Sequence, residues 1–177
     1  QVGVPLSVWN IPFETSFAII EAGISHPGEM QTLHDIIRPD MVVFTHFGDA
    51  HDEGFGGDTQ RKLKEKLIMC AGAQMLVYPH DQQVVFEQIR NAFPQASHYT
   101  WSTQGEGWVN GSASKHQEGT AVQVSMPGNS FRYYIPFTGA VPVSNSLACF
   151  TTMAALGLPM ESRVKAFEDL QPIDMRL

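Results

Sequence analysis

The chain has 177 residues, of which 43% are hydrophobic and 16% are charged, a composition that suits a folded globular domain and argues against disorder. Its 18 acidic and 11 basic side chains give a formal net charge of −7, which argues against a surface that binds nucleic acid or anionic lipid. The two cysteines form no CxxC pair, and no apolar run reaches the roughly 18 residues of a membrane span, so we expect a cytoplasmic protein without a disulfide framework.

Short apolar runs alternate with amphipathic patterns over the first hundred residues. The runs at 16–23, 41–45, 74–79 and 97–102 predict buried strands. The patterns at 28–37, 59–71 and 82–93 predict helices. This alternation is typical of an α/β domain, with a mostly parallel sheet flanked by helices and right-handed crossovers.

The pattern changes after residue 118. Residues 119–137 predict two strands joined at Pro127-Gly128-Asn129, an antiparallel β-hairpin attached to the sheet. Helices are predicted at 144–157, with Ser144 as the cap, and at 160–170. Without repeats or linkers, we expect one domain over residues 1–177, and the opening QVGVPLSVWN, which lacks an initiator Met, predicts a fragment of a longer protein.

Polar residues follow the predicted parallel strands, at the edge where open α/β sheets bind ligands. Glu21 closes the first strand, and His51 lies six residues beyond Thr45, the end of the second. A carboxylate and an imidazole from neighbouring strand ends could bind one metal ion. The alternative is that Glu21 caps a helix and that the polar residues 49–53 form a solvated loop.

Two other histidines, His46 and His80, lie at the ends of the second and third predicted strands, near the edge of the proposed site. The glycine-containing stretch GEGWVNGS lacks the Lys-Ser/Thr ending of a phosphate-binding loop, and GxxxxGK[ST] occurs nowhere in the sequence.

The predicted helix at 59–71 carries Lys62, Lys64 and Lys66. At about 100° per residue, Lys66 lies nearest the apolar stripe of this helix, so we expect it to point inward. A lysine in a low-dielectric pocket has a lowered pKa, and its neutral amine can take up CO2 to form a carbamate that binds Mg2+. The residues alone favour the alternative, in which Lys66 extends past the edge of the core or pairs with a carboxylate.

Several separate motifs then combine. The stretch IIEAGISHPGEMQTLHDIIRPDMVVFTHFGDAHDEGF, followed by KEKL, NSLACFTTMAALG and FEDLQPIDMRL, resembles the central ATPase domain of the Mur ligases, a P-loop NTPase-like fold, over nearly the whole chain. Within the family, the chain is most similar to members that join D-Ala-D-Ala to UDP-N-acetylmuramoyl-tripeptide, especially those fused to an alanine racemase.

The resemblance implies a role for each of five residues. Glu21 and His51 would bind Mg2+, and a carbamylated Lys66 would support the ion at His51. Asn145 would contact the adenine of ATP, and Arg176 would approach the nucleotide. The implied activity is ATP-dependent amide-bond formation through an acyl phosphate, in peptidoglycan precursor synthesis.

The chain departs from the family pattern in three ways. Thr45-His46 stands where relatives usually have Thr-Asn, and the stretch from His51 to Lys66 is one residue longer than usual. The phosphate-binding loop, the N-terminal UDP-binding domain and the C-terminal domain are expected outside this sequence, so the isolated chain is expected to be inactive. Two alternatives stay open: a metal-dependent hydrolase built on Glu21, His51 and Asp49, and a non-catalytic interaction module.

Overall fold

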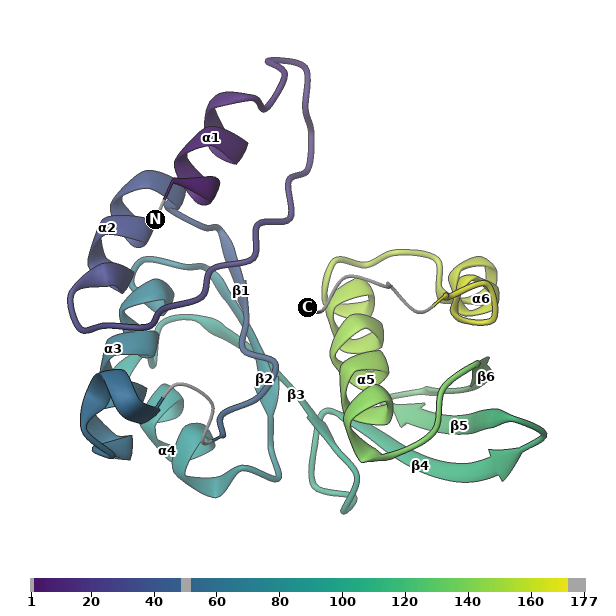
Figure 1. Ribbon diagram of the computed structural model, residues 1–177. Helices are drawn as coiled ribbons and strands as arrows, with labels where there is room; N and C mark the ends of the chain where they lie inside the picture. Colours follow the sequence, from purple (N-terminus) through teal and green to yellow (C-terminus); the bar gives the residue numbers. More distant parts are fainter. Residues whose placement is uncertain (1, 49–51, 172–177) are drawn as a thin grey trace.

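Six strands form one sheet in the part of the chain that the structure describes, residues 2–48 and 52–171 (Figure 1). In this computed structural model the strands follow chain order across the sheet: β1 (Met41–Val43), β2 (Met75–Pro79), β3 (Ser97–Ser102), β4 (Val109–His116), β5 (Gly119–Met126) and β6 (Asn129–Ile135). Strands β1 to β4 pair in parallel, and β4, β5 and β6 pair antiparallel. The predicted α/β class and the β5–β6 hairpin are confirmed.

Helices cover both faces of the parallel strands. Figure 1 shows α2, α3 and α4 on one side and α5 on the other. The helices are α1 (Gly3–Trp9), α2 (Glu29–Ile37), α3 (Thr59–Leu67), α4 (Gln83–Ala92), α5 (Ala140–Ala155) and α6 (Met160–Arg163), with 3-10 turns η1 (Asp52–Phe55), η2 (Ile68–Cys70) and η3 (Val164–Phe167).

Strand β2 contributes to a core on each face of the sheet, because successive side chains of a strand point to opposite faces. Leu76 and Tyr78 of β2 pack into the core that contains Leu63 of α3. Val77, between them, packs into the other core, with Leu147 and other apolar residues of α5. Strand β2 is therefore buried on both sides, as its continuous apolar sequence predicted.

Local sequence signals explain the helices that were predicted correctly. The Asp58 carboxylate accepts a hydrogen bond from the backbone N–H of Arg61 at 2.9 Å and so caps α3. Helix α2 ends at Ile37, and its C-cap Arg38, directly before Pro39, has a positive φ of 47°. The predicted α2, α3 and α4 and the predicted strands at 74–79 and 97–102 are confirmed.

Several predictions about elements were wrong or incomplete, and two elements were missed. Residues 16–23 form no strand, and Ile19 in that segment is 89% exposed. The strand β1 has three residues and lies at an edge of the sheet. Helix α5 begins at Ala140, because Pro142 fits the first turn of a helix, where its missing N–H has no partner to lose. The elements α1 and β4 were not predicted.

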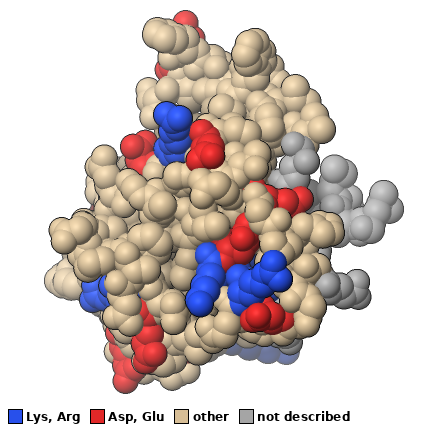
Figure 2. Space-filling model, turned by 90° about the vertical axis from the view of Figure 1, so that its left-hand side faces the viewer, with Lys and Arg blue, Asp and Glu red and all other residues tan. Residues whose placement is uncertain are grey.

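Charges of both signs lie side by side on the face formed by α1 to α4 (Figure 2). This face has no large field of one sign, which agrees with the mixed charges of the sequence. Within residues 2–48 and 52–171, every helix falls short of the length and hydropathy that crossing a membrane requires.

Replacing threonine by valine should affect the free energy of unfolding differently at two buried positions. The Thr151 hydroxyl in α5 has no hydrogen-bond partner in the described residues, whereas the Thr120 hydroxyl donates to the Phe137 carbonyl at 2.7 Å. Thr151→Val should leave the free energy of unfolding unchanged or raise it by up to about 1 kcal/mol, and Thr120→Val should lower it by about 1–3 kcal/mol. Urea unfolding of the full-length protein measures both, and equal losses would contradict the assignment.

The His98 side chain makes folding sensitive to acid. Its Nδ1 accepts a hydrogen bond from the Tyr78 hydroxyl at 2.9 Å, and its Nε2 donates to the Phe93 carbonyl at 3.1 Å. Burial, and then the charge of Arg90, lower the pKa of His98. The unfolded chain therefore binds the proton more readily, so stability is fully present above the unfolded pKa of about 6.5 and falls as the pH drops towards the folded pKa.

We expect His98→Gln to lose less stability than the wild type between pH 8 and pH 5, because glutamine cannot be protonated there. Urea midpoints of the full-length protein at the two pH values measure the difference. Equal losses in both proteins would show that His98 does not contribute.

Candidate functional site

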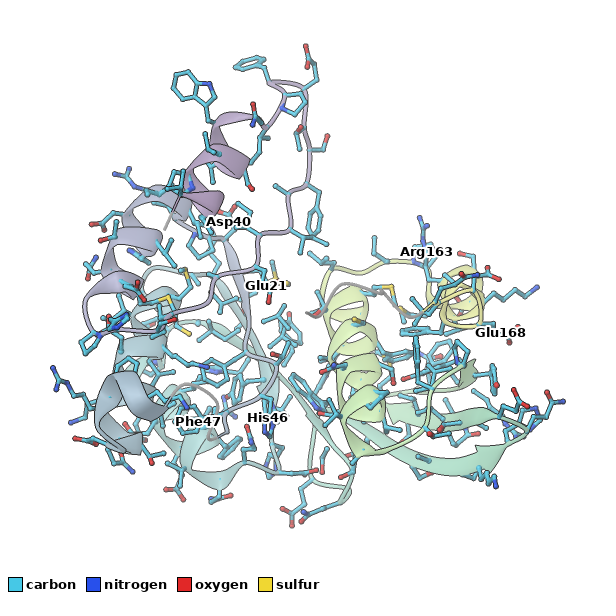
Figure 3. The ribbon with its side chains drawn as sticks, in the orientation of Figure 1. Glu21, Asp40, His46, Phe47, Arg163 and Glu168 are labelled. Atoms are coloured by element: carbon cyan, nitrogen blue, oxygen red, sulfur yellow. The ribbon has the colours of Figure 1, made fainter. Side chains whose placement is uncertain are left out.

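A cavity of about 970 Å³ lies at the carboxyl ends of the parallel strands. Its walls come from the ends of β2 and β3, the β4–β5 pair and the first half of α5; they include His46, Asp81, Gln82, Trp101, Thr103, Ser114, Lys115, Thr120, Ser144 and Asn145. Figure 3 shows where His46 lies, beyond the end of β1. The position agrees with the rule that open α/β sheets bind ligands at this edge, and the volume suits a nucleotide-sized ligand.

Asn145 is exposed and lines this cavity from α5. The helix is held over the strand ends by Trp101, whose indole N–H donates to the Ser144 hydroxyl at 3.3 Å. A side-chain amide carries both donors and an acceptor, so Asn145 can pair with a heterocycle that presents both.

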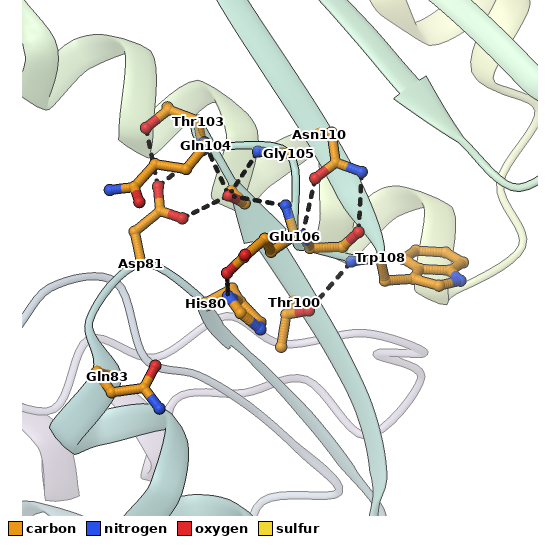
Figure 4. Close-up of polar contacts among 12 residues, drawn as sticks. His80, Asp81, Gln83, Thr100, Thr103, Gln104, Gly105, Glu106, Trp108 and Asn110 are labelled. Carbon is orange, nitrogen blue, oxygen red and sulfur yellow. Dashed lines mark hydrogen bonds and ion pairs between the residues drawn. The ribbon is translucent and has the colours of Figure 1, made fainter.

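The turn between β3 and β4 forms another wall and is fixed by side chains (Figure 4). The Asp81 carboxylate accepts hydrogen bonds from the Ser102 hydroxyl and from the backbone N–H and hydroxyl of Thr103. The Ser102 oxygen in turn accepts from the backbone N–H groups of Gln104 and Gly105. The first half of the glycine-containing stretch at 105–112 thus lies in a tight β3–β4 connection and the second half begins β4, which agrees with its lack of a phosphate-binding signature.

Lys66 lines a second, smaller cavity of about 170 Å³ beside β1. Its Nζ lies 5.8 Å from the centre of the Phe47 ring. Lys62, however, is the more buried lysine, at 1% exposure, and its Nζ donates to the Gly48 carbonyl at 2.5 Å. The expectation that Lys66 is the lysine that points inward is therefore incomplete: Lys66 lines this cavity, but residues 47 and 48 cover the side of α3 that carries Lys62, and Lys62 is the more buried of the two.

Glu21 lies on the extended segment that precedes α2 (Figure 3). Its neighbours Ile20 and Ala22 line the small cavity together with Lys66, whereas Glu21 itself is exposed. Because side chains alternate along an extended chain, the Glu21 carboxylate leaves this segment on the opposite side from its two neighbours. Glu21 and Lys66 thus belong to the same region, but the described contacts do not join them.

The remaining predicted site residues have different outcomes. His51, Asp49 and Arg176 lie outside the described residues. His80 places its ring 4.4 Å from that of Phe86, and its Nδ1 lies 3.7 Å from a Glu106 carboxylate oxygen (Figure 4). Across residues 2–48 and 52–171, no three His, Cys, Asp or Glu side chains gather in a way that could hold a metal ion.

The side chains that the structure describes can be compared with the ligands that Mg2+ prefers. This ion prefers oxygen ligands and usually binds through one or two carboxylates together with waters and substrate phosphates, not through a cage made by protein alone. The exposed Glu21 carboxylate is one oxygen ligand of that kind.

Sequence reasoning missed Gln82 and Lys62. The Gln82 amide forms two hydrogen bonds with the backbone of Phe47, accepting from its N–H at 3.0 Å and donating to its carbonyl at 2.8 Å. Lys62 holds the next residue, Gly48. A lone glutamine after a strand carries no recognisable signal, and Lys62 lies off the apolar stripe of its helix.

Comparison with known families defines the class. The model of the "Mur ligase middle domain" matches residues 1–153. The chain therefore belongs to the Mur ligase family and comprises part of its middle domain.

Individual relatives of the chain narrow the class of protein further. The UDP-N-acetylmuramoyl-tripeptide--D-alanyl-D-alanine ligase of Bacillus subtilis is 28% identical over the whole chain, and that of Escherichia coli is 23% identical. A crystal structure of MurF from Acinetobacter baumannii superposes with a TM-score of 0.88 at 26% identity, covering 99% of this chain and 39% of that one. The chain spans 38% of the B. subtilis ligase and 40% of the E. coli ligase.

A more distant structure shares the fold. MurF from Thermotoga maritima, solved in complex with ADP, superposes with a TM-score of 0.69 at 20% identity, covering 84% of this chain and 34% of that one.

Proposed function

We propose that the chain is part of the middle, ATP-using domain of a cytoplasmic ligase that joins D-Ala-D-Ala to UDP-N-acetylmuramoyl-tripeptide during peptidoglycan precursor synthesis. The observation that carries this proposal is the similarity along the entire chain to the B. subtilis ligase of that name, at 28% identity. The superposition on the A. baumannii enzyme supports it independently. We do not extend the proposal to a fused alanine racemase, because the relatives matched above are ligases by name.

The reaction consists of two transfers. The terminal carboxylate of the tripeptide attacks the γ-phosphorus of ATP, which gives an acyl phosphate and ADP. The amine of D-Ala-D-Ala then attacks the acyl carbon, and inorganic phosphate leaves. Bound Mg2+ would offset phosphate charge in the first transfer.

Asn145 and Glu21 would act at different parts of the nucleotide. Asn145 lines the large cavity, and its amide matches the donor and acceptor pattern of adenine. Glu21, with His51, would hold Mg2+, and Arg176 would approach the nucleotide. None of these residues would act as an acid or a base; they would bind and orient.

Lys66 would act through a carbamate. Its Nζ lies at the edge of the small cavity, next to the Phe47 ring, where part of its hydration is lost. The reaction with CO2 requires the neutral amine of this lysine. The nitrogen attacks the carbon of CO2 and loses a proton, and the resulting carbamate oxygens are ligands that Mg2+ accepts.

The full-length protein should release ADP only when both the UDP-linked tripeptide and D-Ala-D-Ala are present. EDTA should abolish this activity, and Glu21→Gln should lower kcat/KM for ATP by about 100-fold, because metal and phosphate charge would no longer be held. The exposed Glu14→Gln, in the turn that precedes the extended segment, is the matched control and should match the wild type. A Glu21→Gln variant with wild-type kinetics would remove Glu21 from the site, and wild-type protein without ligation would refute the function.

The carbamate has a direct test. Full-length protein equilibrated with 13C-bicarbonate should show a carbamate carbon signal by NMR, and Lys66→Ala should abolish both this signal and ligation. Lys64→Ala, which removes an exposed lysine of the same helix, should keep both. A carbamate signal that survives Lys66→Ala would place the modification elsewhere, and ligation without any such signal would show that the unmodified amine suffices.

A further inference from the structure

The Gln82 amide is held in one orientation. Its Oε1 accepts from the Phe47 N–H at 3.0 Å and its Nε2 donates to the Phe47 carbonyl at 2.8 Å, so exchanging oxygen and nitrogen would oppose like groups at both contacts. The same Nε2 lies 3.1 Å from Nδ1 of His46. Because an amide nitrogen only donates, His46 Nδ1 must accept.

This contact fixes the tautomer of the His46 ring. With Nδ1 as the acceptor, the neutral imidazole carries its proton on Nε2. Within the described residues, the contact with Gln82 is the hydrogen bond that this ring makes, so its Nε2–H is available to donate to a ligand. Gly48 leaves room beside it, since a Cβ built there would lie only 2.9 Å from Nε2.

His46 also lies where the two cavities meet. It is the residue that lines both the large cavity, which contains Asn145, and the small cavity, which contains Lys66. If the base lies at Asn145 and the phosphates lie towards Lys66 and Glu21, the group between them is the sugar. A ribose presents hydroxyl oxygens that accept hydrogen bonds.

We propose that His46 donates a hydrogen bond from Nε2 to a ribose hydroxyl of the bound nucleotide, and that Gln82 is the positioning residue that orients the His46 ring. This rests on the proposed function, because it places ATP in the two cavities. His46 would then contribute to nucleotide binding and to the choice of ribose over deoxyribose.

The test measures KM for ATP, 2′-deoxy-ATP and 3′-deoxy-ATP, together with kcat, in the full-length ligase. For the wild type, the analogue that lacks the contacted hydroxyl should have a KM roughly fivefold to tenfold above that of ATP, the effect of one hydrogen bond. His46→Ala should raise KM for ATP to the same level and should show no further loss with that analogue. The value of kcat should change little, because the contact is the same in ground and transition states.

Two amide variants sharpen the test. The side-chain nitrogen of glutamine reaches about as far as imidazole Nε2, whereas that of asparagine reaches only as far as Nδ1. His46→Gln should therefore restore the wild-type KM to within about twofold, and His46→Asn should behave like His46→Ala. If both amide variants, or neither of them, restored the wild-type KM for ATP, donation from the Nε2 position would be contradicted.

Gln82→Ala tests the positioning role, with Gln83→Ala as the control. Gln83 is adjacent, exposed, and bonds Glu87 within α4 at 2.7 Å. Gln82→Ala should raise KM for ATP and abolish discrimination against the deoxy sugar, and His46→Ala/Gln82→Ala should be no worse than His46→Ala alone. A purely structural role would lower stability and kcat but leave the sugar preference intact.

The outcomes separate this inference from the proposed function. If the wild type ligates with ATP and His46→Ala keeps the wild-type KM, or loses equally for all three nucleotides, the ribose contact is wrong and the ligase stands. If the wild type does not ligate, the proposed function fails, and the ribose contact fails with it.

Discussion

The contact between Leu147 of α5 and Gly111 of β4 sets the distance between this helix and the sheet. Leu147 is fully buried, and a Cβ on Gly111 would lie 2.5 Å from one of its methyl carbons, so only glycine lets the helix approach this closely. One turn earlier, Ser144 accepts the hydrogen bond of the Trp101 indole. Together these contacts hold the first half of α5 above the strand ends. The large cavity, and the position of Asn145 in it, depend on that spacing.

The segment after β1 is held by side chains instead of a sheet ladder. The Phe44 N–H donates to the Val77 carbonyl at 2.8 Å, which extends the parallel pairing by one residue. Beyond that point, Gln82 holds Phe47 from one side and Lys62 holds Gly48 from the other. Two side chains that bind backbone groups restrict a loop as ladder bonds would, and they leave His46 exposed at the boundary of two cavities. A short edge strand can thus still hold a cavity-lining side chain in a fixed place.

Sequence patterns predicted the elements whose signals are local and missed those that depend on partners. Helix α3 was recognisable because Asp58 caps it and its apolar positions recur at helical spacing. The segment 16–23 has the composition of a buried strand, but a strand needs a neighbour, and none of the described strands pairs with it. Strand β4 was not predicted because only the first part of Val109–His116 is buried. The rest of the strand is polar and shows no alternation of apolar and polar residues. For the site, strand-end logic correctly indicated the edge at which Asn145 and His46 meet a cavity, whereas Lys62 depends on a covering loop that periodicity cannot foresee.

A net charge of −7 does not conflict with a role in nucleotide chemistry, because the net charge describes the whole surface, whereas nucleotide binding would depend on the lining of one cavity. Mixed charges on the outer face give no field that would collect polyanions. The wall of the large cavity combines apolar side chains with neutral polar ones such as Thr103, Ser144 and Asn145, and its lysine and aspartate, Lys115 and Asp81, carry opposite charges. Such a wall could bind a base and a sugar by hydrogen bonds without attracting phosphates in general. Under the proposed function, selectivity for a nucleotide would come from geometry at the base and sugar. Phosphate charge would be offset locally, by a metal ion held by Glu21, His51 and the Lys66 carbamate, and not by the surface as a whole.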